Sequence, residues 1–362
     1  MRRDYLMKIG LSTASCLLAL LALEIGLRLY GFNPFRDDRG LIFRPSSSPG
    51  LKYELTPGAH SNFSGTDIRI NSQGFRGPEP SSTRPAQRVL VLGDSIAFGT
   101  VLPWEATFSA LLQQRLRSEK RDVEVLNFAV GGYDTLQEVA LLEARGLKYE
   151  PDLVVVSFCL NDISIASASL EHIERIKSQQ KSLLRNLRVP QFVFTNIEKI
   201  RLKRWLSHMN QPEVFHREYE HQIEAINDNE VELLDLLKNA PRYPSTTWYG
   251  DRDRIGRLRF AFRRLAGISR DHGFPVVVMI VPLLLQEGGL YTHLTAHRIV
   301  AMEAQRAGFD TIDLAPAFMR AGMGNLKSGF GDIIHPNQRG HAIMADLLAD
   351  YIASHPRREP PK

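Results

Sequence analysis

Three polar side chains have the types that acyl-transfer chemistry needs. Ser95 lies in the segment VLGDSIAFG, and the segment GDIIHPNQRGH, near the other end of the chain, places Asp332 three residues before His335. A hydroxyl becomes a strong nucleophile when an imidazole removes its proton, and the imidazole needs a carboxylate to fix its tautomer. Ser95 could instead only cap a helix, and an Asp-x-x-His pair can also bind a metal. Since further metal ligands do not accompany the pair, we expect neither a metal nor a cofactor.

Two other residues could stabilise the negative charge that forms on a substrate oxygen during acyl transfer. Gly132 lies in NFAVGGYD, and Asn161 lies in SFCLNDIS. A glycine lets a backbone N–H approach a substrate closely, and a side-chain amide is a neutral donor that does not compete for the serine proton. Either residue alone is ordinary turn chemistry. Each follows a separate predicted strand, however, so the two could meet Ser95 at one edge of a sheet.

Strands and helices must position these residues, and short apolar runs in the sequence indicate where the strands lie. Four runs rich in β-branched residues, at 88–95, 123–130, 152–160 and 275–283, and a weaker one at 311–314, are continuous rather than alternating. Strands covered on both faces have this pattern. Apolar spacings of three and four predict helices between them, at Phe108, Leu111, Leu112 and Leu116, at Leu136, Val139 and Leu142, and from Pro336 to Ile352. Strands and helices that alternate predict an α/β fold with a parallel sheet, which binds ligands at the carboxyl ends of its strands.

Four blocks of the sequence resemble those of the SGNH hydrolases, also called the GDSL esterase and lipase family. The blocks are GDS at 93–95, the glycine at 132, ND at 161–162 and DxxHP at 332–336. GxSxG is absent, so the α/β-hydrolase elbow is not an alternative. The resemblance implies a three-layer α/β/α, flavodoxin-like fold with about five parallel strands.

The resemblance also implies the role of each residue in the blocks. Ser95 would be the nucleophile, His335 the general base and Asp332 its orienting partner, while the Ser95 N–H, the Gly132 N–H and the Asn161 side chain would form the oxyanion hole. The resemblance covers residues 88–164 and 256–352. Cys159 departs from it, because many members have glycine there; we interpret it as a small buried strand residue, with a reactive thiol as the alternative. His341 resembles a recurrent histidine of the family, for which we expect a structural role.

The first 86 residues precede the predicted sheet. The run from Ile9 to Leu27 is 19 residues long, carries Glu24 as its one charge and nearly matches the thickness of a bilayer core. Basic residues before it predict a cytoplasmic N-terminus at 1–8, a transmembrane anchor at 9–27 and an extracytoplasmic spacer at 28–86. A cleaved signal peptide, lipidation at Cys16 and a buried helix are the alternatives. The end of the spacer, RINSQGFRGPEP at 69–80, could dock onto another element, and the order of anchor, spacer and GDS resembles membrane-tethered bacterial members.

The remaining chain divides into an SGNH hydrolase domain at 87–353, with a helical insertion at 164–256, and a disordered tail at 354–362. The insertion is basic over 175–204 and acidic over 213–235. These halves could pair with each other, form a lid or rest on anionic lipid. Lys and Arg number 45 and Asp and Glu 40, a net charge of +5 that is too weak a field to indicate nucleic-acid binding. Two distant cysteines predict no disulfide framework.

These observations predict a serine esterase that hydrolyses carboxylic esters through an acyl-enzyme. A catalytic domain held outside the cytoplasm, in the periplasm, could reach envelope glycans or lipids, and O-acetyl or short acyl esters of these are the expected substrates. An O-acyltransferase with the same triad is one alternative, because the sequence does not distinguish water from a sugar hydroxyl as acceptor. An inactive envelope-assembly or glycan-binding module is another.

Overall fold

Five parallel strands form the central sheet. They are β5 (Gln87–Gly93), β6 (Val123–Asn127), β7 (Leu153–Cys159), β8 (Val276–Val281) and β9 (Asp310–Asp313), in the order β6-β5-β7-β8-β9. All five predicted strands are therefore confirmed. This order is that of a flavodoxin-like sheet: β6 lies on one side of β5, and the later strands are added on the other side, from β7 onward.

The structure is a computed structural model. It describes residues 2–30, 42–163, 187–190, 192–193, 249, 251–285, 291, 293–329 and 332–355, apart from positions 52 and 64. Most of the predicted insertion, with its basic and acidic halves, lies outside the described residues, as does the tail from residue 356 onward. The last residues assigned to the insertion belong instead to a helix of the domain, α10 (Arg252–His272).

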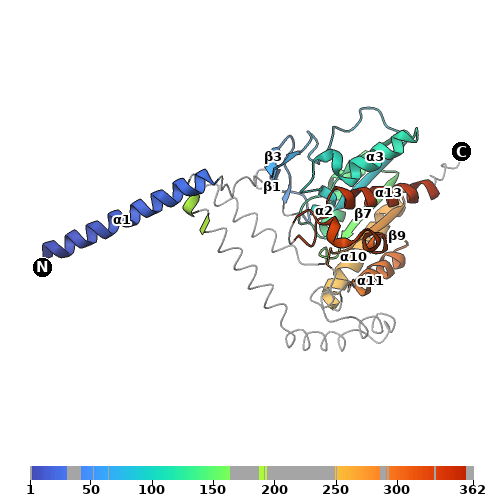
Figure 1. Ribbon diagram of the computed structural model, residues 1–362. Helices are drawn as coiled ribbons and strands as arrows, with labels where there is room; N and C mark the ends of the chain where they lie inside the picture. Colours follow the sequence, from blue (N-terminus) through green and yellow to red (C-terminus); the bar gives the residue numbers. More distant parts are fainter. Residues whose placement is uncertain are drawn as a thin grey trace.

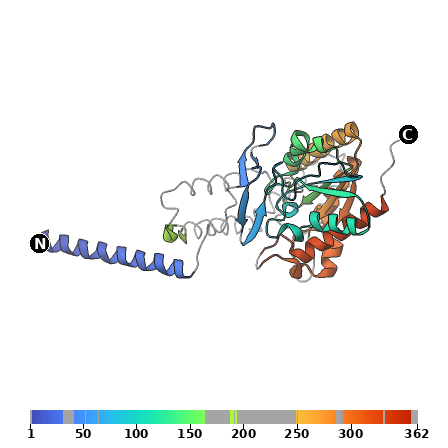
Figure 2. The same cartoon turned by 90° about the horizontal axis from the view of Figure 1, so that it is seen from above.

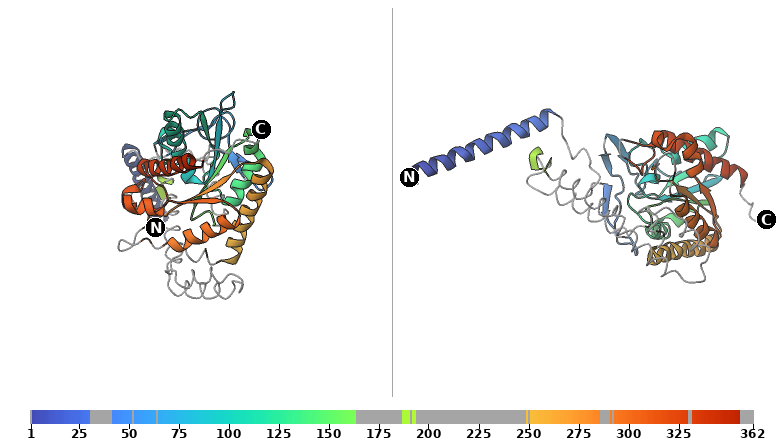
Figure 3. Two further views of the ribbon diagram at one scale, coloured as in Figure 1. Left: turned by 90° about the vertical axis from the view of Figure 1, so that its right-hand side faces the viewer. Right: turned by 60° about the horizontal axis from the view of Figure 1, so that its bottom comes forward.

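Helices cover both faces of the sheet (Figure 1 and Figure 3). One face carries α3 (Phe108–Ser118) and α13 (Gln338–Ser354), which pack against each other. The other carries α4 (Thr135–Leu141), α10 and α11 (Leu294–Arg306). The shorter α2 (Ser95–Phe98) follows β5, and α12 (Ala315–Ala321) follows β9. The three-layer α/β/α prediction is thus confirmed.

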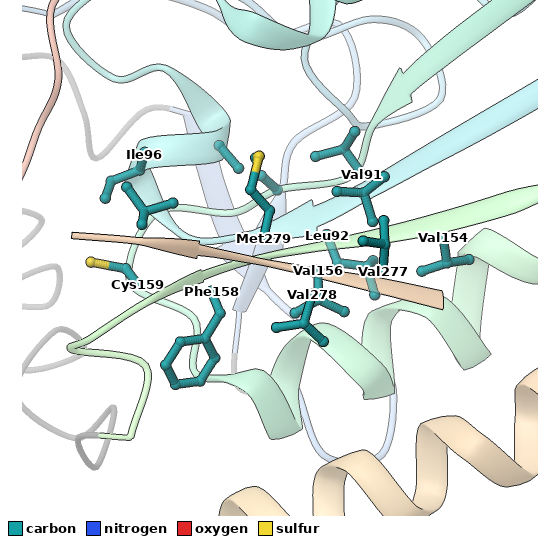
Figure 4. Packing of buried hydrophobic residues seen from close by; sticks show 14 of the residues in the cluster. Val91, Leu92, Ile96, Val154, Val156, Phe158, Cys159, Val277, Val278 and Met279 are labelled. Atoms are coloured by element: carbon teal, nitrogen blue, oxygen red, sulfur yellow. The ribbon is translucent and has the colours of Figure 1, made fainter. Parts of the chain in front are cut away.

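Buried aliphatic side chains of neighbouring strands hold the layers together. Figure 4 shows side chains of β5, β7 and β8, among them Val91, Val156 and Val278, packed in one cluster. Every residue of β7 and β8 is buried, which explains why their sequences are continuous apolar runs.

The predicted start of the last helix needs a correction. Pro336 lies before α13 and pairs with Lys327 in an isolated bridge, and the helix begins at Gln338. Asn337 is the N-cap, because its side-chain oxygen accepts from the N–H groups of Arg339 and Gly340.

The segment expected to be a spacer is largely part of the folded domain. It forms two antiparallel hairpins, β1 (Phe43–Pro45) with β2 (Tyr53–Leu55) and β3 (His60–Phe63) with β4 (Thr66–Arg69). Figure 2 shows these strands beside the sheet. Phe75 stacks on Phe128 with ring centroids 4.7 Å apart, and Arg76 forms a bridge with Asn127 at the end of β6. Residues 69–80 therefore dock on the edge of the sheet, as their apolar composition suggested.

The chain begins with a long helix, α1 (Arg2–Leu29), that extends away from the domain (Figure 2). Its part from Gly10 to Leu29 is apolar and long enough to cross a membrane, and its residues are not buried inside the protein. A signal sequence would share these features.

Candidate active site

Ser95 lies where β5 passes directly into α2. Asp94 is the N-cap of this helix, since its Oδ1 accepts from the Ile96 N–H at 2.8 Å. Gly93 has a φ of +155°, and a methyl group there would lie 2.6 Å from the Cβ of Ala97 and 3.1 Å from the backbone oxygen of Ser157. The turn that presents Ser95 therefore requires glycine at this position.

The structure brings Ser95, His335 and Asp332 together in one hydrogen-bonded chain. The Ser95 Oγ lies 2.9 Å from the His335 Nε2. On the other side of the ring, Nδ1 lies 3.0 Å from Oδ2 of Asp332. With Nδ1–H donating to the carboxylate, Nε2 has a free lone pair that accepts from the Ser95 hydroxyl. The His335 and Asp332 side chains are each 24% exposed, so the chain of groups is open to a substrate.

The Asp332 carboxylate is held by more than the imidazole. Its Oδ1 accepts from the backbone N–H groups of Ile334 and His335, and its Oδ2 accepts from the Ser328 hydroxyl at 2.7 Å. Partial burial raises the pKa of Asp332, but these hydrogen bonds outweigh it and hold the pKa well below its ordinary value. Ser328 was missed by the sequence analysis, because a serine four residues before an aspartate in a loop carries no distinctive signal.

The loop with Gly132 approaches Ser95 from β6. A methyl group on Gly131 would lie 4.0 Å from the Ser95 Cβ, and Gly132 has a φ of +83°, which favours glycine. Within the described part of the chain, the N–H groups of Ser95 and Gly132 donate to no protein acceptor. Both donors are therefore available to a ligand beside the Ser95 hydroxyl.

Asn161 lies beside the residue that precedes Ser95. Its Nδ2 is 3.4 Å from Oδ2 of Asp94, while its Oδ1 is buried and accepts no hydrogen bond from the described residues. A primary amide has two N–H donors, so one remains for a ligand. Ser95 and Asn161 follow β5 and β7, the two neighbouring strands between which the strand order of the sheet reverses, and this is where sheets of this type bind ligands.

Buried carboxyl groups form a cluster near Ser95. Burial raises the pKa of Asp94, although the Ile96 N–H and His335 oppose the rise. Burial, with the charges of Asp94 and Asp134, raises the pKa of Glu138 well above its ordinary value, and Asp162 behaves likewise. Neither carboxylate oxygen of Glu138 has a hydrogen-bond partner among the described residues. Glu138 is therefore stable in this position only as the neutral acid.

Cys159 and His341 have structural surroundings. Cys159 is fully buried, and burial raises the pKa of its thiol well above the ordinary value, which does not suit a nucleophile. His341 is buried, and its Nδ1 accepts from the Phe108 N–H at 3.0 Å. Burial lowers the pKa of His341 to about 3, so the ring is neutral and joins α13 to the first turn of α3.

A buried arginine from the segment before β5 supports α2, the helix that begins with Ser95. Arg76 is 1% exposed and donates to the carbonyls of Phe98, Gly99 and Leu102 at 2.5–2.6 Å. Phe98 ends α2, so Arg76 fixes the far end of the helix that begins with Ser95. Sequence analysis had assigned Arg76 to a docking segment without a role at the site, because its partners are backbone groups.

This arrangement of groups suits nucleophilic acyl transfer. It provides a hydroxyl with a base in hydrogen-bonding contact, a carboxylate behind the base, and two N–H groups and an amide around the hydroxyl.

Part of the chain matches known proteins. The chain is 32% identical to an arylesterase of Vibrio mimicus over 82 residues, which is 23% of this chain and 41% of that protein. It is 38% identical to esterase TesA of Pseudomonas aeruginosa over 77 residues, or 21% of this chain and 38% of that one. These matches span only about two fifths of the length of each curated relative.

Solved structures of low identity also match the chain. A crystal structure of TesA matches with a TM-score of 0.41 and 16% identity, covering 74% of this chain and 99% of that one. An acetylxylan esterase from Geobacillus stearothermophilus matches with a TM-score of 0.41 and 14% identity, covering 74% and 94%.

A sequence model for one family spans most of the region described above. The GDSL-like Lipase/Acylhydrolase family matches residues 91–343, which is well over half of the chain and runs from β5 into α13. The matched region includes Ser95, Gly132, Asn161, Asp332 and His335. The chain therefore belongs to the GDSL-like lipase/acylhydrolase (SGNH) family.

Proposed function

We propose that the protein is a serine esterase that cleaves carboxylic esters through an acyl-enzyme. The observation that carries the proposal is the hydrogen-bonded chain from the Ser95 Oγ through His335 to Asp332, with distances of 2.9 Å and 3.0 Å. Membership of a family of acylhydrolases supports it, as does the likeness to an arylesterase and an esterase over part of the chain.

Acylation begins at the Ser95 hydroxyl. As the Ser95 Oγ forms a bond to the ester carbonyl carbon, its proton moves to the His335 Nε2, and Asp332 stabilises the resulting imidazolium. The carbonyl oxygen becomes an oxyanion, which the N–H groups of Ser95 and Gly132 and the Asn161 amide would bind. When the oxyanion collapses, the bond to the alcohol oxygen breaks and His335 returns the proton to the departing alcohol.

Deacylation repeats the sequence with water. His335 removes a proton from the water that attacks the acyl carbon, and the same donors hold the second oxyanion. Its collapse breaks the bond to the Ser95 Oγ, which takes the proton back from His335. A sugar hydroxyl in place of water would turn the same steps into O-acyl transfer.

The N-terminal helix suggests where the substrate lies. We propose that α1 contains an uncleaved single-pass anchor at 9–27, with residues 1–8 in the cytoplasm and the catalytic domain outside it. Only residues 30–41 separate this helix from Ile42, and a chain of that length spans at most about 45 Å. The site would then act close to the membrane surface, where O-acetyl or short acyl esters of envelope glycans or lipids are the accessible substrates.

A fluorophosphonate probe tests the serine mechanism directly. We expect the full-length protein in detergent to be labelled at Ser95 and to hydrolyse p-nitrophenyl acetate, and Ser95→Ala to lose both properties. Ser118→Ala is a matched control, since among the described residues its hydroxyl donates only to the Arg115 carbonyl at the end of α3. A folded wild-type protein that is neither labelled nor active would contradict the mechanism.

Product analysis tests the acceptor. The wild-type protein, an acetylated glycan and an unacetylated sugar acceptor should yield free acetate for an esterase and an acetylated acceptor for a transferase. The finding of both products would mean that water and sugar compete for the acyl-enzyme.

A further inference from the structure

The hairpin β1–β2 contacts the loop that carries Gly132. The Tyr53 hydroxyl, from β2, donates to the Gly131 carbonyl at 2.9 Å. This carbonyl and the Gly132 N–H belong to the same peptide unit. Because a trans peptide is planar and its C=O and N–H point in opposite directions, a bond that holds the carbonyl also sets the direction of the N–H.

Tyr53 is itself held firmly. Its side chain is buried, and its ring makes edge-to-face contacts with Phe43 at 5.4 Å and with Tyr133 at 5.2 Å between centroids. The Tyr133 hydroxyl donates to the Tyr53 carbonyl, which fixes the backbone of β2 to the same loop. Burial, together with the nearby charges of Asp134 and Asp94, raises the pKa of Tyr53 well above its ordinary value, so its hydroxyl keeps the proton that it donates.

The hydrogen bond affects the strength of the donor as well as its direction. When a peptide carbonyl accepts a hydrogen bond, the whole peptide unit becomes more polarised, and the N–H of the same unit becomes a better donor. The gain is greatest when the N–H faces a full negative charge, as in the tetrahedral intermediate, and small when it faces a neutral ester.

We propose that Tyr53 is a positioning residue of the oxyanion site, which holds and polarises the Gly131–Gly132 peptide for the transition state. The inference rests on the proposed serine esterase function and adds to it a residue from outside the region that the family match covers. It also gives the hairpin that follows the N-terminal helix a part in catalysis.

Tyr53→Phe is the informative substitution, because it keeps the ring and its packing and removes only the hydroxyl. Removing a direct oxyanion donor costs about 100- to 1000-fold in kcat, and Tyr53 acts one step behind such a donor. We expect kcat for p-nitrophenyl acetate to fall about tenfold while KM stays within about twofold. The affinity for a trifluoromethyl ketone, which forms a tetrahedral adduct with the serine, should fall by the same factor.

Tyr351→Phe is the matched control, since the Tyr351 hydroxyl donates to Asp310 on an exposed surface. It should retain wild-type kcat. The rate constant of fluorophosphonate labelling gives a second measurement that does not depend on the fraction of folded protein, and it should also fall about tenfold in Tyr53→Phe.

The outcomes separate the two proposals. Unchanged kcat, inhibitor affinity and labelling rate in Tyr53→Phe, with an active wild-type protein, would overturn the role of Tyr53 alone. A rise in KM without a fall in kcat would also overturn it, because a positioning residue of the oxyanion site acts on the transition state. A wild-type protein that is neither labelled nor active would overturn the esterase proposal and this inference with it.

Discussion

Replacing Arg76 should destabilise the domain, because Arg76 supports α2, the helix that begins with Ser95. Arg76→Ala removes three hydrogen bonds to the carbonyls of Phe98, Gly99 and Leu102, at the end of α2 and just after it. Each hydrogen bond from a charged donor contributes about 1.5–3 kcal/mol to stability. Burying the guanidinium costs several kcal/mol of hydration free energy, and the alanine variant no longer bears this cost. We therefore expect a net loss of about 2–4 kcal/mol in the free energy of unfolding.

Thermal unfolding in detergent measures this loss. At about 2–4 °C per kcal/mol for a domain of this size, the melting temperature of Arg76→Ala should fall by roughly 5–15 °C. Arg76→Lys should fall by about half as much, because a single ammonium group cannot reproduce the planar fork that spans the three carbonyls. Burial lowers the pKa of Arg76 to about 10, so the guanidinium is charged at the neutral pH of the assay.

Arg69→Ala is the matched control for this prediction. The Arg69 side chain is 77% exposed and, within the part of the chain that the structure describes, pairs only with Asp67 on its own hairpin, so its loss should change the melting temperature by less than about 2 °C. If Arg76→Ala melts within 2 °C of Arg69→Ala, the three short hydrogen bonds do not stabilise the helix as argued. Below the melting temperature, kcat should also fall in Arg76→Ala, since α2 begins with Ser95.

Three further substitutions test other parts of the site. Asp332→Asn should lower kcat by about 1000- to 10,000-fold at every pH, because an amide no longer fixes the tautomer of His335; a loss below tenfold would contradict the orienting role. Gly93→Ala should lower the melting temperature and kcat together, since its methyl group would lie 2.6 Å from the Ala97 Cβ, and wild-type values for both would refute the steric argument. Glu138→Gln should raise stability, with a gain that grows as pH rises above about 4.3. The folded protein keeps the Glu138 proton that the unfolded chain releases, so the free energy of unfolding of the wild-type protein declines with rising pH in this range. If urea titrations show that Glu138→Gln raises the free energy of unfolding by the same amount at every pH, Glu138 is not a buried neutral acid.

The strands and the four sequence blocks were predictable because they depend on local pattern. A strand buried on both faces must be apolar throughout, so β7 and β8 are recognisable from composition alone. A helix N-cap such as Asn337 has a local signal too, but Pro336, directly before it, carried a competing one, and the start of α13 was placed too early.

The segment 42–86 shows where local pattern fails. Its strands are three or four residues long, too short for a period of two to be evident, and they are held by contacts with residues far along the chain. Ile42, Leu55 and Ile68 nevertheless lie in the hydrophobic core. A stretch rich in Pro, Ser and Gly therefore resembled a spacer although its few apolar residues are buried.

The sequence by itself determined which groups could react and which strands carry them: Ser95, His335, Asp332 and the oxyanion donors, each in a recognisable block. Only the tertiary structure decided which groups support them. Arg76 and Tyr53 act through hydrogen bonds to backbone carbonyls, and Ser328 through a hydroxyl across a loop. Every residue has a backbone carbonyl, so residue type does not reveal which carbonyl will accept a hydrogen bond. The supporting side chain and its carbonyl come within hydrogen-bonding distance only when the chain folds.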